Sequence, residues 1–243
     1  MKAQKNNSQN QVILYGCHAT FEALKNPLRK IIKILITDEN EAEFKKEFPT
    51  LCYQKVQKKE IEKMLPFNAV HQGFAVVTKP LEPVFLEDLI KKTKNDEKCV
   101  VLILDQVTDP QNIGAIMRSA AAFNAAGIIV QDKNAPIESG SMAKASAGTI
   151  EFMPLVRATN LSRAIEQLKK DGFWIIGMDG YAKQSLRDIN KNAKLAVVMG
   201  SEGSGMRRLI QESCDITVRL DINPRVESLN VSVAAAIVLY ELA

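Results

Sequence analysis

The sequence predicts an α/β fold built on a parallel sheet that helices cover on both faces. Three observations indicate this fold. Short apolar runs alternate with helical patterns along the chain, and residues 99–104 form a continuous apolar run typical of a buried parallel strand. Polar or glycine-rich loops follow several of these runs. With 243 residues, 46% hydrophobic and 25% charged, the chain has a globular composition.

Residues 11–79 predict a small α/β domain, because short strands and helices alternate there. Residues 1–10, rich in Asn, Gln and Lys, are expected to form a disordered tail. Residues 80–97 contain two prolines, a short amphipathic segment and a polar run, which predict a linker with a helix leading into the next domain. The expected strands are 12–14, 31–36 and 73–78, and the expected helices are 20–25, 39–48 and 57–65.

Residues 98–243 predict a second, larger domain, because strands and helices alternate over this length as in doubly covered parallel sheets. Ligands in such sheets bind beyond the carboxyl ends of the strands. The expected strands are 99–104, 127–130, 173–177, 195–199 and 216–220, and the expected helices are 113–123, 161–170, 206–212 and 228–242.

Positive charge is concentrated in the first third of the chain. Residues 1–80 carry 13 Lys and Arg against 8 Asp and Glu, whereas the remainder carries 19 against 20. Such an excess attracts phosphate backbones. Interleaved Lys and Glu residues are also typical of solvated helix faces, so charge alone favours no function.

The cysteines and histidines show no zinc-ligand spacing, so no metal site is predicted. The polar start of the chain lacks the apolar core of a signal peptide, and no apolar stretch approaches the length of a membrane span. A cytoplasmic protein with reduced thiols is expected, with no membrane partner.

The first loop of interest, residues 105–120, follows the strand at 99–104. Asp109 and Pro110 form a turn or helix-start signal, and Asn112 and Arg118 lie six positions apart on the next expected helix and its entry. Spacing alone favours a purely structural interpretation, in which Arg118 flanks a packing face of small residues.

The second loop, Gly200-Ser201-Glu202-Gly203-Ser204-Gly205, follows the strand at 195–199. Three glycines allow close approach of a ligand or positive φ angles, and a tight connection would need only one. The glycine order is not that of a dinucleotide site, and the Lys-Ser/Thr of a phosphate loop is missing. Glu202 favours a cationic or hydroxyl-bearing ligand.

The third loop, residues 225–236, leads into the last helix. Ser228, Asn230 and Ser232 place three polar groups on the first turn of an otherwise apolar helix, where Ser228 is a candidate N-cap. Buried polar groups need partners.

Together these three segments resemble, in order and spacing, the signature motifs of the SpoU/TrmH family of ribose 2′-O-methyltransferases, in the SPOUT superfamily. The N-terminal part is similar to the family's ribosomal-protein-like substrate-binding domain, through Tyr15 to Leu24 and through His71-Gln72-Gly73. The arrangement is most similar to the branch that acts on a guanosine of large-subunit (23S) ribosomal RNA. The resemblance therefore extends over nearly the whole chain.

The resemblance implies a Rossmann-like catalytic domain with a C-terminal trefoil knot, a rare exception to unknotted topology. It also implies S-adenosylmethionine as the cofactor, RNA as the substrate, and a homodimer with its active site at the subunit interface. The implied catalytic and substrate-positioning residues are Asn112, Arg118, Glu202, Ser228 and Asn230. The implied cofactor-binding residues are Met199, Gly200, Ser201, Gly203, Gly205, Leu220, Ile222, Ser228 and Leu229.

One segment departs from the family pattern. Relatives usually have Ile-Pro-Met and then a glycine before the last motif, whereas this chain has Leu220-Asp221-Ile222 and then Asn223-Pro224-Arg225. Those positions usually contact the cofactor through the backbone.

Three alternatives to ribosomal RNA methylation remain at this point: methylation of a transfer RNA ribose, an RNA-binding factor without catalysis, and a nicotinamide-dependent oxidoreductase. All five polar site positions are retained, which opposes loss of catalysis. The glycine order and the late position of the glycine loop oppose the oxidoreductase.

Overall fold

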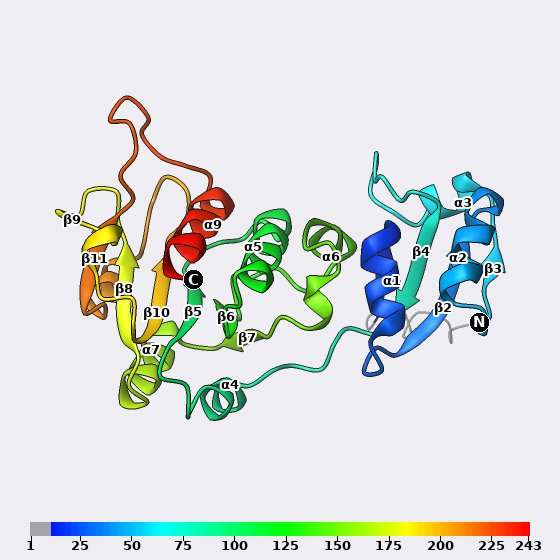
Figure 1. Ribbon diagram of the computed structural model, residues 1–243. Coiled ribbons are helices and arrows are strands. Elements are labelled where there is room, and N and C mark those ends of the chain that lie inside the picture. Colours follow the sequence, from blue (N-terminus) through cyan, green and yellow to red (C-terminus); the bar gives the residue numbers. More distant parts are fainter. Residues whose placement is uncertain (1–10) are drawn as a thin grey trace, which may run out of the picture. The chain divides into compact units, whose positions relative to one another are not determined.

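The computed structural model describes residues 11–243, so the tail expected at 1–10 lies outside the described residues. The chain divides by its packing into two units (Figure 1). The first contains residues 11–82 and 137–151, and the second contains residues 83–136 and 152–243. Among the described residues, no helix is both long enough and apolar enough to cross a membrane.

The first unit contains a four-stranded sheet in the order β1-β4-β2-β3. Strand β4 pairs antiparallel with β1 and with β2, and β2 pairs parallel with β3. An aromatic cluster fills one face, where Phe21 meets Phe48 and Phe74 edge to face at 5.1 Å between ring centroids. The elements are β1 (Val12–Tyr15), α1 (Cys17–Lys25), β2 (Ile31–Ile36), a 3₁₀ helix (Asp38–Asn40), α2 (Glu41–Glu47), β3 (Gln54–Lys55), α3 (Lys58–Glu62) and β4 (Phe74–Thr78).

A segment distant in sequence completes this first unit. Residues 137–151 form α6 (Gly140–Ala145) and a 3₁₀ helix (Thr149–Glu151), and α6 packs against β1. A side chain at Gly140 would collide with the carbonyl oxygen of Ile13, so glycine permits this close approach.

A buried ion-pair cluster joins this segment to the rest of the first unit. The side chain of Arg29 is fully buried and contacts Glu138 at 2.5 Å and Glu151 at 2.7 Å. Asn26 also donates to the Glu151 carboxylate, at 2.9 Å. Since buried charges require partners, the three charged side chains depend on one another.

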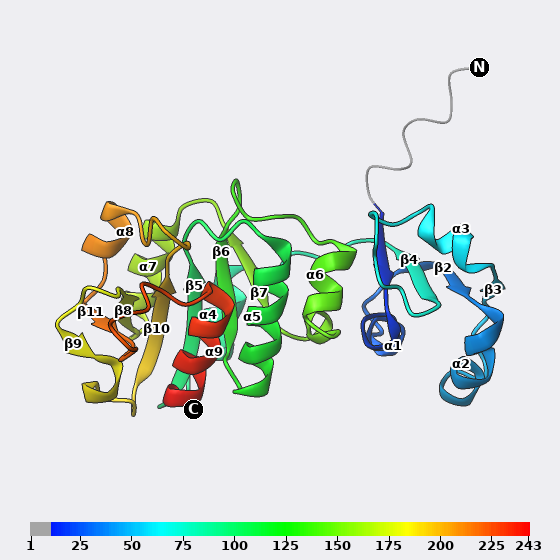
Figure 2. The ribbon, with the colours of Figure 1, turned by 90° about the horizontal axis from the view of Figure 1, so that it is seen from above.

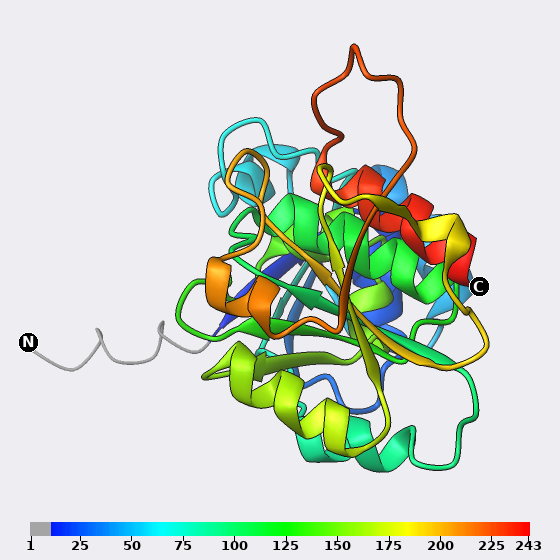
Figure 3. The same cartoon turned by 90° about the vertical axis from the view of Figure 1, so that its left-hand side faces the viewer.

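The second unit is a seven-stranded parallel sheet in the order β7-β6-β5-β10-β8-β11-β9. This confirms the predicted α/β class. Figures 2 and 3 show α5 and α9 on one face of the sheet and α4 and α7 on the other. The strands are β5 (Cys99–Leu104), β6 (Gly127–Gln131), β7 (Leu155–Ala158), β8 (Trp174–Met178), β9 (Gln184–Ser185), β10 (Lys194–Met199) and β11 (Ile216–Arg219). The helices are α4 (Leu86–Lys92), α5 (Pro110–Ala122), α7 (Leu161–Lys170), α8 (Arg208–Glu212), α9 (Val231–Leu242) and the 3₁₀ helix Leu186–Asp188.

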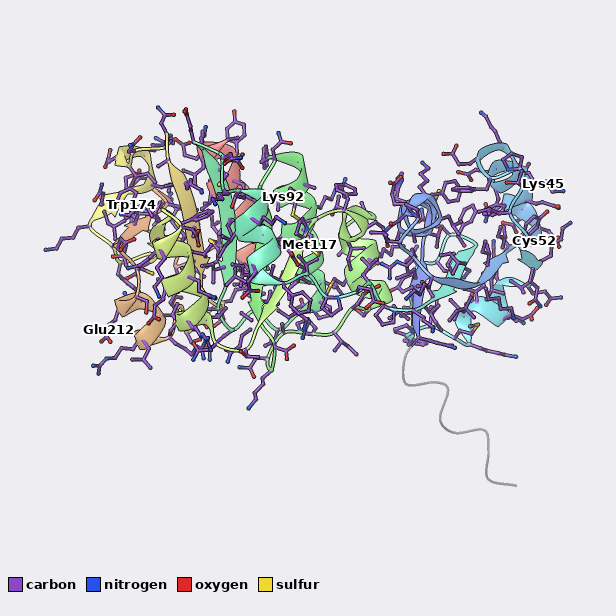
Figure 4. The ribbon with its side chains drawn as sticks, turned by 90° about the horizontal axis from the view of Figure 1, so that it is seen from below. Lys45, Cys52, Lys92, Met117, Trp174 and Glu212 are labelled. Atoms are coloured by element: carbon purple, nitrogen blue, oxygen red, sulfur yellow. The ribbon has the colours of Figure 1, made fainter. Side chains whose placement is uncertain are left out.

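Both faces of this sheet are buried, which explains the continuous apolar runs. Val101 and Ile103 of β5 join the core shared with α4, α7 and α8. On α5, Met117 is completely buried and is labelled in Figure 4. Helix α9 packs on α5, where the rings of Phe123 and Tyr240 meet at 5.8 Å.

Three expected boundaries shift for identifiable reasons. The strand expected from residue 73 starts at Phe74, because Gly73 has a φ of 81°. The helix expected from 206 starts at Arg208, because the backbone N–H of Arg207 donates to Asp105. The last helix starts at Val231, and its N-cap is Asn230 rather than Ser228, since the Asn230 side chain accepts from the Ser232 N–H.

The sequence analysis missed three strands and one α-helix, and also the 3₁₀ helices Thr149–Glu151 and Leu186–Asp188. Strands β3 and β9 have two residues each, and α6 has six, so they are too short for a periodic pattern. Strand β7 is an edge strand of four residues. Its Arg157 donates to the Asp132 carboxylate at 2.8 Å and to the carbonyl of Pro136.

Arg29→Ala should destabilise the first unit by about 3–5 kcal/mol, because it leaves Glu138 and Glu151 buried without a partner. Urea unfolding of the full chain, monitored by amide exchange in the first unit, measures this loss. The matched control is Lys30→Ala, which removes an exposed pair with Glu82 and should cost under about 1 kcal/mol. Equal unfolding curves for both variants would contradict the prediction.

Candidate functional site

A cavity of about 410 Å³ opens in the second unit at the carboxyl ends of β8, β10 and β11. Its volume lies within the range of roughly 300–1,000 Å³ typical of small-molecule sites. All the predicted cofactor-binding residues line it. The lining comprises Met178, Asp179, Gly180, Tyr181, Met199, Gly200, Ser201, Glu202, Gly203, Ser204, Gly205, Met206, Gln211, Leu220, Ile222, Glu227, Ser228, Leu229, Val231 and Ala234.

The glycine loop forms a closed turn at one side of this cavity. Ser201 and Gly205 exchange two backbone hydrogen bonds, at 3.0 and 3.1 Å. A side chain at Gly200 would collide with the backbone of Gly205, and Gly203 and Gly205 have φ angles of 85° and 65°. The three glycines are therefore needed by the turn itself, which presents backbone groups to the cavity.

A hydrogen-bond network joins the three loops identified in the sequence. The amide nitrogen of Asn230 donates to Glu202 Oε1 at 2.6 Å and to Asn112 Oδ1 at 3.1 Å. The backbone N–H of Val231 also donates to Glu202 Oε1, at 3.0 Å. Glu202 therefore places a negative charge at the N-terminus of α9, where the helix dipole stabilises it.

This network explains the polar residues at the start of α9. Asn230 Oδ1 accepts from the backbone N–H of Ser232 at 2.9 Å and from its hydroxyl at 2.5 Å. Ser228 has a different position, because it lines the cavity. Glu202, expected to meet a cationic or hydroxyl-bearing ligand, lines the cavity, and its Oε1 is bonded by Asn230 and by the first N–H of α9.

Arg118 lies apart from these residues. It is exposed on α5, does not line the cavity, and has no hydrogen bond or ion pair with any side chain among residues 11–243. Helix α5 starts at Pro110, three residues before the expected position 113, with Asp109 as the N-cap accepting from the Gln111 N–H at 2.9 Å.

A buried ion pair that the sequence analysis missed holds the far end of the glycine loop. The Asp105 carboxylate, directly after β5, is completely buried and accepts from the backbone N–H and the Nε of Arg207, each at 2.8 Å. A lone acidic residue directly after a wholly apolar strand was the available signal. The pair joins the end of β5 to the start of α8 and so restrains the loop between β10 and α8.

Asp221, at which this chain departs from the usual family pattern, forms two side-chain contacts in the structure. Its carboxylate accepts from the Ser185 hydroxyl at 2.6 Å and pairs with Arg219 Nε at 3.3 Å. Arg219 also donates to the carbonyl oxygens of Ala182 and Lys183. These contacts join the exit of β11 to β9 and to residues that follow the cavity wall at 178–181.

Within residues 11–243, no three His, Cys, Asp or Glu side chains are grouped so that they could hold a metal ion. Three of the cysteine thiols, those of Cys17, Cys99 and Cys214, have pKa values raised to about 11, chiefly by burial.

Comparison with known families matches almost the whole chain. Residues 99–240 match the SpoU rRNA Methylase family, and residues 13–84 match the family described as RNA 2′-O ribose methyltransferase substrate binding. A Bacillus subtilis protein named as a TrmH family tRNA/rRNA methyltransferase, YacO, is 37% identical over 244 residues, which cover 97% of this chain and 96% of that protein. A Staphylococcus aureus (strain COL) protein of the same description is 35% identical, covering 95% and 94%.

Solved structures of similar fold include the SpoU methyltransferase AviRb from Streptomyces viridochromogenes in complex with AdoMet. It has a TM-score of 0.79 at 22% identity, covering 96% of this chain and 89% of that one. The AdoMet-bound rRNA methyltransferase from Sinorhizobium meliloti has the same TM-score and identity, covering 96% and 87%. At these identities the likeness shows a shared fold.

Asp221→Ala should weaken binding of S-adenosylmethionine by about threefold to tenfold, since the wall at Leu220 and Ile222 loses two restraints of modest strength. Isothermal titration measures the change in Kd. The control is Glu212→Ala, which removes an exposed pair with Arg208 outside the cavity lining (Figure 4). An Asp221→Ala Kd within twofold of the wild-type value would contradict the prediction.

Proposed function

The chain belongs to the SpoU rRNA Methylase family, and we propose that it methylates the ribose 2′-hydroxyl of a guanosine in large-subunit (23S) ribosomal RNA. Family membership makes it an RNA methyltransferase that depends on S-adenosylmethionine. The ribose oxygen and the ribosomal target are the proposal. The main supporting observation is the cavity whose rim is joined by the Asn112, Glu202 and Asn230 network.

The residues of the cavity fit S-adenosylmethionine. Its wall is largely apolar, with Met199, Leu220, Ile222 and Leu229, as an adenosine requires, and the turn from Gly200 supplies backbone donors and acceptors. When bound, this cofactor supplies an activated methyl group on a positively charged sulfur. Residues from the loops after β8, β10 and β11 would hold it.

We assign Arg118 to the substrate rather than to the cofactor, because it is exposed on α5 and outside the cavity lining. Methyl transfer forms an oxygen–carbon bond, breaks a sulfur–carbon bond and releases the hydroxyl proton. An arginine stays protonated, so Arg118 would hold a phosphate and stabilise the developing charge on the ribose oxygen, while the proton leaves to solvent. Asn112, Glu202, Ser228 and Asn230 would position the reacting groups.

We also propose a homodimer with its active site at the subunit interface. Val233, Ile237 and Tyr240 are exposed at helical spacing and form an apolar stripe along α9. An unpartnered stripe of this kind supports an interface. Helix α5, which carries Arg118, packs beside α9, so covering the stripe would bring Arg118 near the interface.

In this proposal residues 11–79 bind RNA and residues 80–97 form the linker to the next domain. Residues 98–243, with the trefoil knot typical of the superfamily, perform catalysis. The packing of residues 137–151 with the first unit adds a contribution from the later part of the chain to the RNA-binding unit. A ribosomal RNA substrate implies a cytoplasmic enzyme.

Transfer RNA is the second candidate substrate, because the relatives of 35–37% identity are named as tRNA/rRNA methyltransferases. Protein-free ribosomal RNA and bulk transfer RNA, each incubated with the protein and labelled S-adenosylmethionine, separate the two. We expect label on a guanosine ribose of the large-subunit RNA. Label only in transfer RNA would make transfer RNA the substrate. Cofactor binding without label in either RNA would indicate that the substrate is an assembled ribosomal particle. Failure to bind the cofactor would favour an RNA-binding factor without catalysis.

Arg118→Ala should abolish methyl transfer and leave the Kd for S-adenosylmethionine unchanged, because Arg118 is outside the cavity lining. Arg118→Lys should also fail, since a point charge lacks the planar fork of a guanidinium. Single-turnover methylation and isothermal titration measure the two properties. Methylation by Arg118→Ala above a tenth of the wild-type rate would remove Arg118 from the mechanism.

A further inference from the structure

The loop between α3 and β4, residues 63–73, exposes large apolar side chains in the first unit. Phe67 is 95% exposed and Val70 is 64% exposed, whereas the aromatic cluster of the same unit is largely buried. Exposed apolar groups that lie together on a soluble surface are typical of binding sites. The loop is therefore a candidate interaction surface.

Hydrogen bonds from three different elements hold the end of this loop, at Val70 and Gln72. Gln72 Oε1 accepts from the backbone N–H of Cys17 at 3.2 Å, and Asn40 donates to the Gln72 carbonyl at 2.9 Å. Lys144 of α6 donates to the carbonyl oxygen of Val70. A side chain at Gly73 would collide with Asn40, so the chain can turn here only with glycine. A loop held in this way presents Phe67 without a large loss of entropy on binding.

These contacts also unite the two N-terminal motifs of the sequence. The first motif contains Gly16 and Cys17, and the second is His71-Gln72-Gly73. The Gln72 side chain of the second motif bonds to Cys17 of the first. Within the second motif, the backbone N–H of Gly73 donates to His71 Nδ1 at 3.0 Å. The two motifs are therefore joined at the end of the loop that carries Phe67.

Lysines outnumber carboxylates beside the loop. Lys59 and Lys63 are exposed and form no ion pair within residues 11–243; of the two glutamates of α3, Glu60 is engaged in the capping box and Glu62 is exposed. The pKa of His71 is lowered, chiefly by its burial; Glu62 raises it, and Lys58 and Lys144 add to the lowering. Lys63 belongs to the loop itself and Lys144 of α6 donates to it, so lysines from two parts of the chain lie beside the loop.

We propose that the 63–73 loop is an RNA-binding surface on which Phe67 stacks against an unpaired base of the substrate. An aromatic face accepts any base, and neighbouring lysines attract the phosphates on either side. Lysine is depleted in protein–protein interfaces, so the unpaired lysines beside Phe67 favour RNA as the occupant. This inference rests on the proposed function, because it assumes an RNA substrate.

The test compares variants of the full-length protein for binding to whichever of the two RNAs the wild type methylates, at one fixed salt concentration. Phe67→Ala should weaken RNA binding by about 5- to 150-fold, the range for loss of one base–aromatic stack. Phe67→Leu should weaken it similarly, because leucine keeps apolar area but has no aromatic face. Phe67→Tyr should bind as the wild type does. All variants should keep the wild-type Kd for S-adenosylmethionine, measured separately.

The matched control is Leu28→Ala, which removes an apolar side chain, 78% exposed, beyond the other end of α1. It should leave RNA binding unchanged. Wild-type RNA affinity in both Phe67→Ala and Phe67→Leu would overturn the inference while leaving the proposed function intact. If Phe67→Ala changes the oligomeric state in gel filtration but not the RNA affinity, the loop is a protein interface instead. A wild-type protein that binds neither of these RNAs nor the assembled ribosomal particle would overturn the proposed function as well.

Discussion

The Glu202 carboxylate, shared between Asn230 and the start of α9, is the interaction on which the candidate site depends. The first N–H groups of a helix have no acceptor within the helix. At the start of α9, the N–H of Val231 donates to Glu202 and the N–H of Ser232 donates to Asn230. Through Asn230 the same contacts reach Asn112 at the start of α5. The loops after β5, β10 and β11 thus meet at one cluster of hydrogen bonds.

The parallel sheet makes this meeting possible. Because β5, β10, β8 and β11 run in the same direction, their carboxyl ends lie at one edge, and the loops that follow them are neighbours. The Asp105–Arg207 pair and the Asp221–Ser185 contact restrain two of these loops from outside the cavity. The cavity is therefore shaped by side chains that do not line it.

In the first unit, too, a surface loop is restrained by side chains from distant parts of the chain. Its buried Arg29 and the two glutamates of residues 137–151 attach a later part of the chain, and Lys144 from that part holds the 63–73 loop. Residues 137–151 thus lie within the match to the SpoU rRNA Methylase family in sequence but pack with the first unit.

The sequence by itself determined the α/β class, most strands and long helices, and the three loops, because burial on both faces demands continuous apolar runs and tight turns demand glycine. Their resemblance to one family named the five candidate side chains. Only the tertiary structure decided that Asn230, not Ser228, caps α9 and that Glu202 is bonded to it. It also decided that Arg118 lies outside the cavity, and that Asp105 and Asp221 restrain the loops. The carboxylates of Asp105, Glu202 and Asp221 each bond a residue more than 25 positions away, and no local pattern in a chain records which distant donor a carboxylate will meet.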